Sequence, residues 1–474
     1  MTRLSNAALA GLPAAIGRPR YDRGAMAQGV VHFGPGAFHR AHQAAAFDTL
    51  LGEDPRWGIT AVSLNSPSTA AALNPQDGLY TLAMLDADTE YRVIGAIGGV
   101  LTGDQPGAIR AALAAPATRI VSMTVTEKGY GLGGDGTLDF AHPAIAADLE
   151  PGAAPRSIIG WLAAGLGERR RRGLPGLTLL SCDNLADNGR KLGAAVRAFA
   201  QAVDPETARW IEQEARFPNA MVDAITPATD DGLRARVAAE LGLADAWPIQ
   251  RERFTQWVIE DDFVGERPAL ELAGVTFTRD VRAFEAAKLR LLNGAHSTLA
   301  YVGLGLGHHS VARAMADPAL ARFVERLMRD DIAPSLTPPP GLDLDAYIGA
   351  ILGRFRNPAI EHRLSQIAWD GSQKLPYRIL DTVRDALAAG RPIARLAVPI
   401  AAWLRFIARA AEARSPITDP LADRLLAAGG DWRAIVAMRD IFGDLPGQPR
   451  FMAAVEQAHD ALADPAAYAL EPAA

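Results

Sequence analysis

The chain has 474 residues, of which 49% are hydrophobic and 22% are charged, a composition typical of globular proteins with two or three domains at this length. Its formal net charge of −6 argues against nucleic acid or an anionic membrane as the main partner. The single cysteine, Cys182, excludes an internal disulfide. No apolar run reaches the ~20 residues of a membrane span, and the N-terminus lacks the apolar core of a signal peptide. We therefore expect a cytoplasmic globular protein.

The first half of the sequence alternates predicted strands with predicted helices. Alternation of this kind favours a parallel α/β sheet. The strands are predicted at 29–33, 58–64, 91–94, 119–125 and 177–180, and the helices at 38–47 and 106–115.

The pattern changes near residues 278–281. The last strand-like segments are 254–259 and 275–277, and after Val281 the sequence has long Ala/Leu/Arg helices with a 3.6-residue period. Breaks are expected at 338–341 and at Pro376. We therefore predict an α/β domain at 1–279 and a mainly helical domain at 280–474.

A glycine-rich turn follows the first predicted strand. Gly34 and Gly36 begin a G-x-G pattern, but His39 replaces the third glycine of the dinucleotide fingerprint. The turn alone is a weak signal, and its position between a strand and a helix supports a nucleotide site. The second predicted strand ends at Asn65, without the acidic residue that would bind a ribose 2′-hydroxyl. Residues 57–91 contain no Lys or Arg that could neutralise a 2′-phosphate, and this absence favours NAD over NADP.

Lys288 begins an apolar run that also contains Asn293 and His296. At about 100° per residue, Asn293 lies roughly 140° and His296 roughly 80° from Lys288 on an α-helix, so the three share one broad face. Desolvation would lower the pKa of such a lysine and make it a general base, while the amide and the imidazole hold an oxygen. A solvated lysine beside a structural asparagine and histidine explains the segment equally well.

Six motifs together resemble the long-chain polyol dehydrogenases, the mannitol dehydrogenase family, which includes mannitol 2-dehydrogenase, fructuronate (mannonate) reductase and tagaturonate (altronate) reductase. They occur in the family's order along the chain. The motifs are VHFGPGAFHRAHQ (31–43), TVTEKGY (124–130), SCDNL (181–185), FPNAMVDAITP (217–227), KLRLLNGAH (288–296) and DGSQKLP (370–376).

The resemblance implies a Rossmann-type N-terminal domain that binds NAD(H), a helical C-terminal domain and a metal-free active site. It implies that Lys288 is the general base, that Asn293 and Asn184 hold the developing oxyanion and that His296 orients the substrate. Substrate contacts are expected from Asp223, Lys374 and Arg378. Cofactor contacts are expected from Gly34, Gly36, Ala37, Phe38, Asn65, Thr126 and Glu127. The adjacent His308 and His309 do not form a convincing zinc cluster.

The substrate implied by the resemblance is a sugar acid or a polyol. Mannitol dehydrogenases tend to carry an arginine eight residues before the pocket lysine, where this chain has Gln366. The run from Gln366 to Arg378 is more similar to fructuronate reductases, and Lys374 with Arg378 can bind a carboxylate. D-Mannonate/D-fructuronate is therefore the leading pair, with D-mannitol/D-fructose as the alternative and a non-catalytic nucleotide-binding protein less favoured. We expect a monomer or small homo-oligomer whose partner is a small molecule, with no nucleic acid or membrane.

Overall fold

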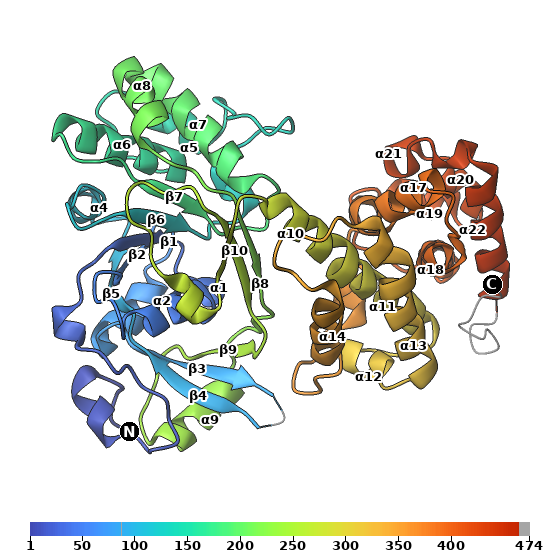
Figure 1. Ribbon diagram of the computed structural model, residues 1–474, viewed down its shortest axis with the longest axis horizontal. Helices are drawn as coiled ribbons and strands as arrows, with labels where there is room; N and C mark the ends of the chain where they lie inside the picture. Colours follow the sequence, from blue (N-terminus) through green and yellow to red (C-terminus); the bar gives the residue numbers. More distant parts are fainter. Residues whose placement is uncertain (87, 464–474) are drawn as a thin grey trace. The chain divides into compact units, whose positions relative to one another are not determined.

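The computed structural model describes residues 1–86 and 88–463. Its chain forms two compact units, Met1–Val281 and a second that begins at Arg282, here the N-terminal and C-terminal units. In Figure 1 the first runs from blue to yellow-green and the second continues to red. Among the described residues, no helix combines the length and the apolar character that crossing a membrane requires.

A five-stranded parallel sheet forms the centre of the N-terminal unit (Figure 1). Its order is β5-β2-β1-β6-β7, and each neighbouring pair is parallel. The strands are β1 (Val30–Phe33), β2 (Ile59–Ser63), β5 (Ile97–Thr102), β6 (Ile120–Met123) and β7 (Thr178–Ser181). β1, β6 and β7 are buried along their whole length, as expected for strands covered on both faces. The predicted α/β fold is confirmed.

Helices and further strands cover the two faces of this sheet. Val31 and Phe33 of β1 belong to a core with α4, α6 and α7, whereas Val30 belongs to a core with α2 on the other face. The helices of the unit are α1 (Ala37–Ala41), α2 (Gln43–Leu50), α3 (Ser68–Leu73), α4 (Pro106–Leu113), α5 (Pro143–Asp148), α6 (Ile158–Arg171), α7 (Asn188–Val203), α8 (Pro205–Glu214) and α9 (Asp231–Leu241).

Two three-stranded sheets complete the N-terminal unit. One has the order β4-β3-β9 and the other the order β11-β10-β8. Their strands are β3 (Tyr80–Leu85), β4 (Glu90–Ile94), β8 (Ala220–Asp223), β9 (Ile249–Glu252), β10 (Gln256–Glu260) and β11 (Thr276–Thr278).

The prediction that 91–94 belongs to the parallel sheet is wrong. This segment is β4, which pairs antiparallel with β3 in a separate sheet. β5 takes the expected place beside β2. The sequence of β5, IGGVLT, contains Gly98 and Gly99, and glycine lowers strand propensity, so the pattern did not indicate a strand there.

The described part of the C-terminal unit is built almost entirely from helices. They are α10 (Val281–Ala287), α11 (Gly294–Gly305), α12 (Val311–Met315), α13 (Pro318–Arg326), α14 (Leu344–Phe355), α15 (Leu364–Ile367), α16 (Gly371–Leu375), α17 (Asp381–Ala388), α18 (Ala394–Glu412), α19 (Ala422–Ala428), α20 (Trp432–Val436), α21 (Arg439–Phe442) and α22 (Pro449–Ala461). π-Helical turns are also present at Lys288–Asn293, Leu327–Ile332 and Pro376–Leu380.

The expected helix break at 338–341 is confirmed, because these residues are not helical. The break expected at Pro376 is wrong. α16 continues through the π-helical turn Pro376–Leu380 into α17. Proline lacks the N–H of an α-helical hydrogen bond, and a π-helical turn changes the bonding pattern at this position, so the helix continues past it.

Candidate active site

The loops after β1, β2, β6 and β7 meet at one edge of the parallel sheet, here called the carboxyl edge. Parallel neighbours present their carboxyl ends on the same side, which is where open α/β sheets bind nucleotides. The structure thus brings most of the predicted N-terminal site residues to one edge. They are Gly34, Gly36, Ala37 and Phe38 after β1, Asn65 after β2, Thr126 and Glu127 after β6, and Asn184 after β7.

The glycine turn at the carboxyl edge is shaped by a close approach of two loops. Gly34 has φ +84°, and a Cβ atom there would lie 2.2 Å from the carbonyl oxygen of Thr124. No other residue fits this position without moving the backbone. Gly36 is the N-cap residue of α1 in extended conformation. The turn therefore exposes backbone that can approach a pyrophosphate.

His39 occupies the place of the third fingerprint glycine, and the structure explains this difference. In the dinucleotide fingerprint that glycine allows close packing of helix on strand. Here the His39 ring is fully buried and stacks on the His32 ring of β1, with centroids 3.3 Å apart. Burial, followed by the charges of neighbouring residues beginning with His32, holds the pKa of His39 well below its usual range. The helix is thus packed through an uncharged imidazole pair.

Asp183 joins the loop after β6 to the loop after β7. Its carboxylate accepts hydrogen bonds from the backbone N–H of Val125 (3.0 Å) and Thr126 (2.9 Å) and from the Tyr130 hydroxyl (2.7 Å). Thr126 has φ +66°, an unfavourable conformation for a residue with a β-branched side chain. Burial raises the pKa of Asp183. Asp183 was not predicted as a site residue, although it lies beside Asn184 in the polar run after β7.

Two arginines, Arg40 and Arg92, are close in sequence to the loops of the carboxyl edge, but their side chains are engaged elsewhere in the fold. Arg40 is fully buried and donates to the carbonyl of Trp247 at 2.7 Å. Arg92 lies on β4 and pairs with Asp48 at 2.5 Å. The residues directly after β2 include Asn65 and Ser66, both exposed, and no cation. These donors fit a ribose hydroxyl better than a 2′-phosphate, so the edge fits NAD.

Asp223 is the last residue of β8 and therefore lies in a different sheet from the carboxyl edge. It is buried, with 8% of its surface exposed. β8 pairs antiparallel with β10, and Asp223 faces Gln256 in this register.

In the C-terminal unit, Lys288 and Asn293 begin and end one π-helical turn. A π-helix bonds residue i to residue i+5, so these two residues lie about one turn apart along the same side. On the α-helix that the sequence predicts, Lys288 and Asn293 would be roughly 140° apart around the helix axis. Lys288 is buried, with 9% of its surface exposed. π-Helical turns inside α-helices often occur at functional sites.

His296 lies one turn further along, in α11, with its ring against Phe355 (centroids 4.5 Å) and edge-on to His362 (5.1 Å). Its Nε2 atom is buried and has no hydrogen-bond partner among the described residues. Burial, then His362, Arg354 and Arg378, holds the pKa of His296 well below its usual range. His296 is therefore a neutral imidazole with a free nitrogen. His362 carries no motif that predicts this contact from the sequence.

Arg378 connects the turn Pro376–Leu380 to the turn Lys288–Asn293. Its Nη1 donates to the Ser297 hydroxyl at 3.1 Å and lies 3.5 Å from the Asn293 carbonyl oxygen. Burial and the nearby Arg378 charge lower the pKa of Lys374, whose Nζ lies 3.7 Å from an Asp370 oxygen. Arg378 thus lies beside the turn that Lys288 begins and Asn293 ends, and its charge acts on both His296 and Lys374.

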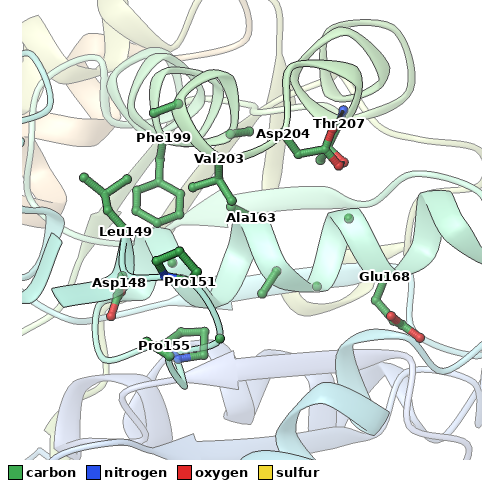
Figure 2. Close-up of a pocket in the computed structure, with 18 of the residues that line it drawn as sticks. Asp148, Leu149, Pro151, Pro155, Ala163, Glu168, Phe199, Val203, Asp204 and Thr207 are labelled. Carbon is green, nitrogen blue, oxygen red and sulfur yellow. Dashed lines mark hydrogen bonds between the residues drawn. The ribbon is translucent and has the colours of Figure 1, made fainter. Parts of the chain in front are cut away.

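Two other features involve none of the predicted site residues. A cavity of about 540 Å³ lies between α6, α7 and the loop around Pro151 (Figure 2), and none of the predicted site residues lines it. His308 pairs with Asp317 at 3.5 Å, which supports a structural role. Within residues 1–86 and 88–463, no group of three or more His, Cys, Asp or Glu residues is arranged to hold a metal ion.

Comparison with known proteins identifies the family. Residues 28–272 match the mannitol dehydrogenase Rossmann domain, and residues 280–463 match the mannitol dehydrogenase C-terminal domain. The chain is 41% identical to D-mannonate oxidoreductase from Escherichia coli, over 95% of this chain and 96% of that protein.

Two solved structures are similar over nearly the whole chain. Mannitol 2-dehydrogenase from Pseudomonas fluorescens, a ternary complex with NAD and D-mannitol, is 38% identical with a TM-score of 0.80 and covers 98% of this chain and 97% of that one. A substrate-free D-sorbitol dehydrogenase is 33% identical with a TM-score of 0.90, over 99% and 100% of the two chains. The chain belongs to the mannitol dehydrogenase family and is an NAD-dependent dehydrogenase that acts on secondary alcohols.

Proposed function

We propose that this enzyme interconverts D-mannonate and D-fructuronate with NAD(H), without a metal ion and with Lys288 as the general base. The observation that carries the substrate assignment is the charge of Arg378. Burial lowers its pKa, and among the described residues its side chain has no carboxylate partner. A partly buried guanidinium without a counter-ion favours a ligand that brings a negative charge.

Lys374 supplies a second cation for the same carboxylate. It is one helical turn before Arg378, and the Arg378 charge helps to lower the pKa of Lys374 after the larger effect of burial. Asp370 neutralises Lys374 only in part, because their closest atoms are 3.7 Å apart. In this proposal the guanidinium holds two carboxylate oxygens in its planar fork, and the ammonium adds a point charge.

The remaining roles follow from what oxidation of an alcohol requires. Lys288 takes the hydroxyl proton, and the amides of Asn293 and Asn184 donate to the oxygen as negative charge develops on it. Bound NAD⁺ accepts the hydride from the carbinol carbon, which becomes the ketone carbon. His296 is neutral, so its free Nε2 exchanges a hydrogen bond with a substrate hydroxyl, and Asp223 accepts one from another.

In the proposal, residues 1–279 bind the cofactor and residues 280–474 provide most of the substrate chemistry. Gly34, Gly36, Ala37 and Phe38 approach the pyrophosphate. Asn65 holds the adenosine ribose, and the loop with Thr126 and Glu127 borders the rest of the cofactor.

The second candidate is interconversion of D-mannitol and D-fructose. The similarity to a mannitol 2-dehydrogenase over almost the whole chain favours it. Against it, Gln366 stands at the position where mannitol dehydrogenases tend to carry an arginine, and a neutral polyol leaves the Arg378 charge without a counter-ion.

A ketose panel separates the two candidates. NADH oxidation should be measured with D-fructuronate and D-fructose under the same conditions. We expect kcat/KM for D-fructuronate to exceed that for D-fructose by roughly tenfold or more, the scale of one charged hydrogen bond. A higher kcat/KM for D-fructose would replace the sugar-acid assignment with the mannitol assignment.

A further inference from the structure

A small cavity in the N-terminal unit lies away from the carboxyl edge. Its volume is about 80 Å³, and it is enclosed by α2, by β3, β4 and β9, and by Trp257 of β10. Six of its lining side chains can donate hydrogen bonds: Arg92, Arg251, Trp257, His42, Thr49 and Thr255. No aspartate or glutamate lines it.

Two of these donors are buried without an acceptor. The Nε atom of Arg251 and the Nε1 atom of Trp257 have no hydrogen-bond partner among the described residues. Only 3% of the Trp257 surface is exposed. The one hydrogen bond that Arg251 makes within the described chain runs from Nη2 to the Met84 sulfur at 3.7 Å, and a thioether is a weak acceptor. Buried donors of this strength are costly unless something accepts from them.

The two arginines of the cavity differ in their charge balance. Arg92 donates to the Asp48 carboxylate at 2.5 Å and to the Thr49 hydroxyl at 3.2 Å. Arg251 has no ion-pair partner among the described residues. Burial and then the charge of Arg92 lower the pKa of Arg251 to about 10, so it remains protonated at neutral pH. The Glu252 charge acts in the opposite direction and raises this pKa, but among the described residues no carboxylate pairs directly with Arg251. The cavity therefore holds a guanidinium without a direct counter-ion.

We propose that this cavity, here called the Arg251 pocket, binds a small tetrahedral oxyanion of the phosphate or sulfate class. The guanidinium offers a planar fork that matches two oxygens, and the Trp257 indole N–H donates to a third. A volume of about 80 Å³ accommodates an ion of this size and excludes a nucleotide or a sugar phosphate. None of the residues that line the Arg251 pocket is among the proposed cofactor or substrate residues.

Calorimetric titration with inorganic phosphate tests the proposal. The enzyme should be saturated with NADH, so that the cofactor's own phosphate contacts are occupied, in a buffer of large organic ions. We expect saturable binding of one phosphate, weakened roughly tenfold or more by Arg251→Gln. Arg253→Gln is the matched control, because Arg253 is close in sequence but exposed and paired with Asp86 and Glu90. It should bind phosphate like the wild type.

Trp257→Phe provides a second test if Arg251→Gln fails to fold. It removes only the N–H donor and keeps an aromatic ring against His42 and Phe47. We expect phosphate binding to weaken several-fold while NADH affinity is unchanged. Absence of phosphate binding in the wild type, or equal binding by wild type and both variants, would overturn the proposal. Tight chloride binding that excludes phosphate would overturn the oxyanion class.

Discussion

Arg378 combines a structural contact with an unneutralised charge. Its Nη1 atom is engaged with Ser297 and lies near the Asn293 carbonyl, which holds it against the turn that carries Lys288. Its Nε and Nη2 donors make no hydrogen bond with described residues and are available to a ligand. Removal of this residue should therefore affect all substrates slightly and an acidic substrate strongly.

We expect Arg378→Ala to lower kcat/KM for D-fructuronate more than for D-fructose. The additional loss should be about 1.5–3 kcal/mol, the scale of a hydrogen bond to a charged group. Steady-state kinetics with both ketoses measure this difference.

Ser297→Ala is the control, because it removes the Arg378–Ser297 bond and leaves the charge in place. It should lower both kcat/KM values by a similar factor. If Arg378→Ala also lowers the two values equally, Arg378 is only structural and the carboxylate contact is wrong.

At the residue scale, short motifs were enough to select candidate site residues, but not the residues that contact them in the fold. Lys288, Asn293 and His296 could be selected because an unusual set of polar side chains interrupts an apolar run. Asp183 and His362 could not, because their roles depend on contacts with residues distant in sequence: Asp183 with the loop at Val125 and Thr126, and His362 with His296.

At the element scale, the two π-helical turns at Lys288–Asn293 and Pro376–Leu380 pack closely. A Cβ atom on Gly294, directly after the first turn, would lie 2.8 Å from the Arg378 carbonyl oxygen in the second. Because this neighbour is backbone, it cannot move aside without shifting the turn. Gly294 therefore sets the separation between Lys288 and Arg378.

We expect Gly294→Ala to destabilise the protein by about 1–3 kcal/mol, as overpacking does in a well-packed core, and to lower kcat. Gly349→Ala is the matched control, because Gly349 lies in α14 with no heavy atom within 4 Å of an added Cβ. It should stabilise the helix by roughly 0.5–1 kcal/mol. Urea unfolding and kcat measure both effects, and a Gly294→Ala protein as stable and active as the wild type would contradict this packing argument.

Element predictions succeeded where hydrophobic periodicity is strong and failed where sheet pairing decides the structure. The buried strands β1, β2, β6 and β7 were evident as apolar runs. β5 was missed because its glycines hide a strand that pairing with β2 stabilises. The π-helical turns could not be predicted, because an α-helical period was assumed throughout the C-terminal unit.

At the scale of the whole molecule, buried histidines link stability to pH. His32 lies inside the N-terminal unit, hydrogen-bonded to Ser122, and burial lowers its pKa to about 3. In the unfolded chain a histidine has a pKa of about 6.5, so the unfolded state binds the proton first. Stability that is present above pH 6.5 is therefore lost as the pH falls from 6.5 towards 3.

We expect the wild type to lose about 2 kcal/mol more stability between pH 7 and pH 5 than His32→Gln does. The exposed His309→Gln variant should keep the wild-type pH dependence. Urea unfolding at the two pH values measures the difference. Identical pH dependence in wild type and His32→Gln would show that His32 does not contribute.

The sequence was sufficient to predict the family, the α/β and helical parts and the cofactor. The substrate could not be predicted as firmly, because binding of a carboxylate depends on which cations remain unpaired after folding. Arg92 and Arg170 are both neutralised by acidic partners in the folded chain, whereas Arg378 has none among the described residues.

Single-turnover hydride transfer in a Lys288→Met variant measures whether Lys288 is the general base. Methionine keeps most of the side-chain volume in this buried position but cannot accept a proton. We expect a rate at least ~10²-fold below the wild type, the typical contribution of a general base, with an unchanged Kd for NADH. A rate within a few-fold of the wild type, with NADH and D-fructuronate bound normally, would contradict it.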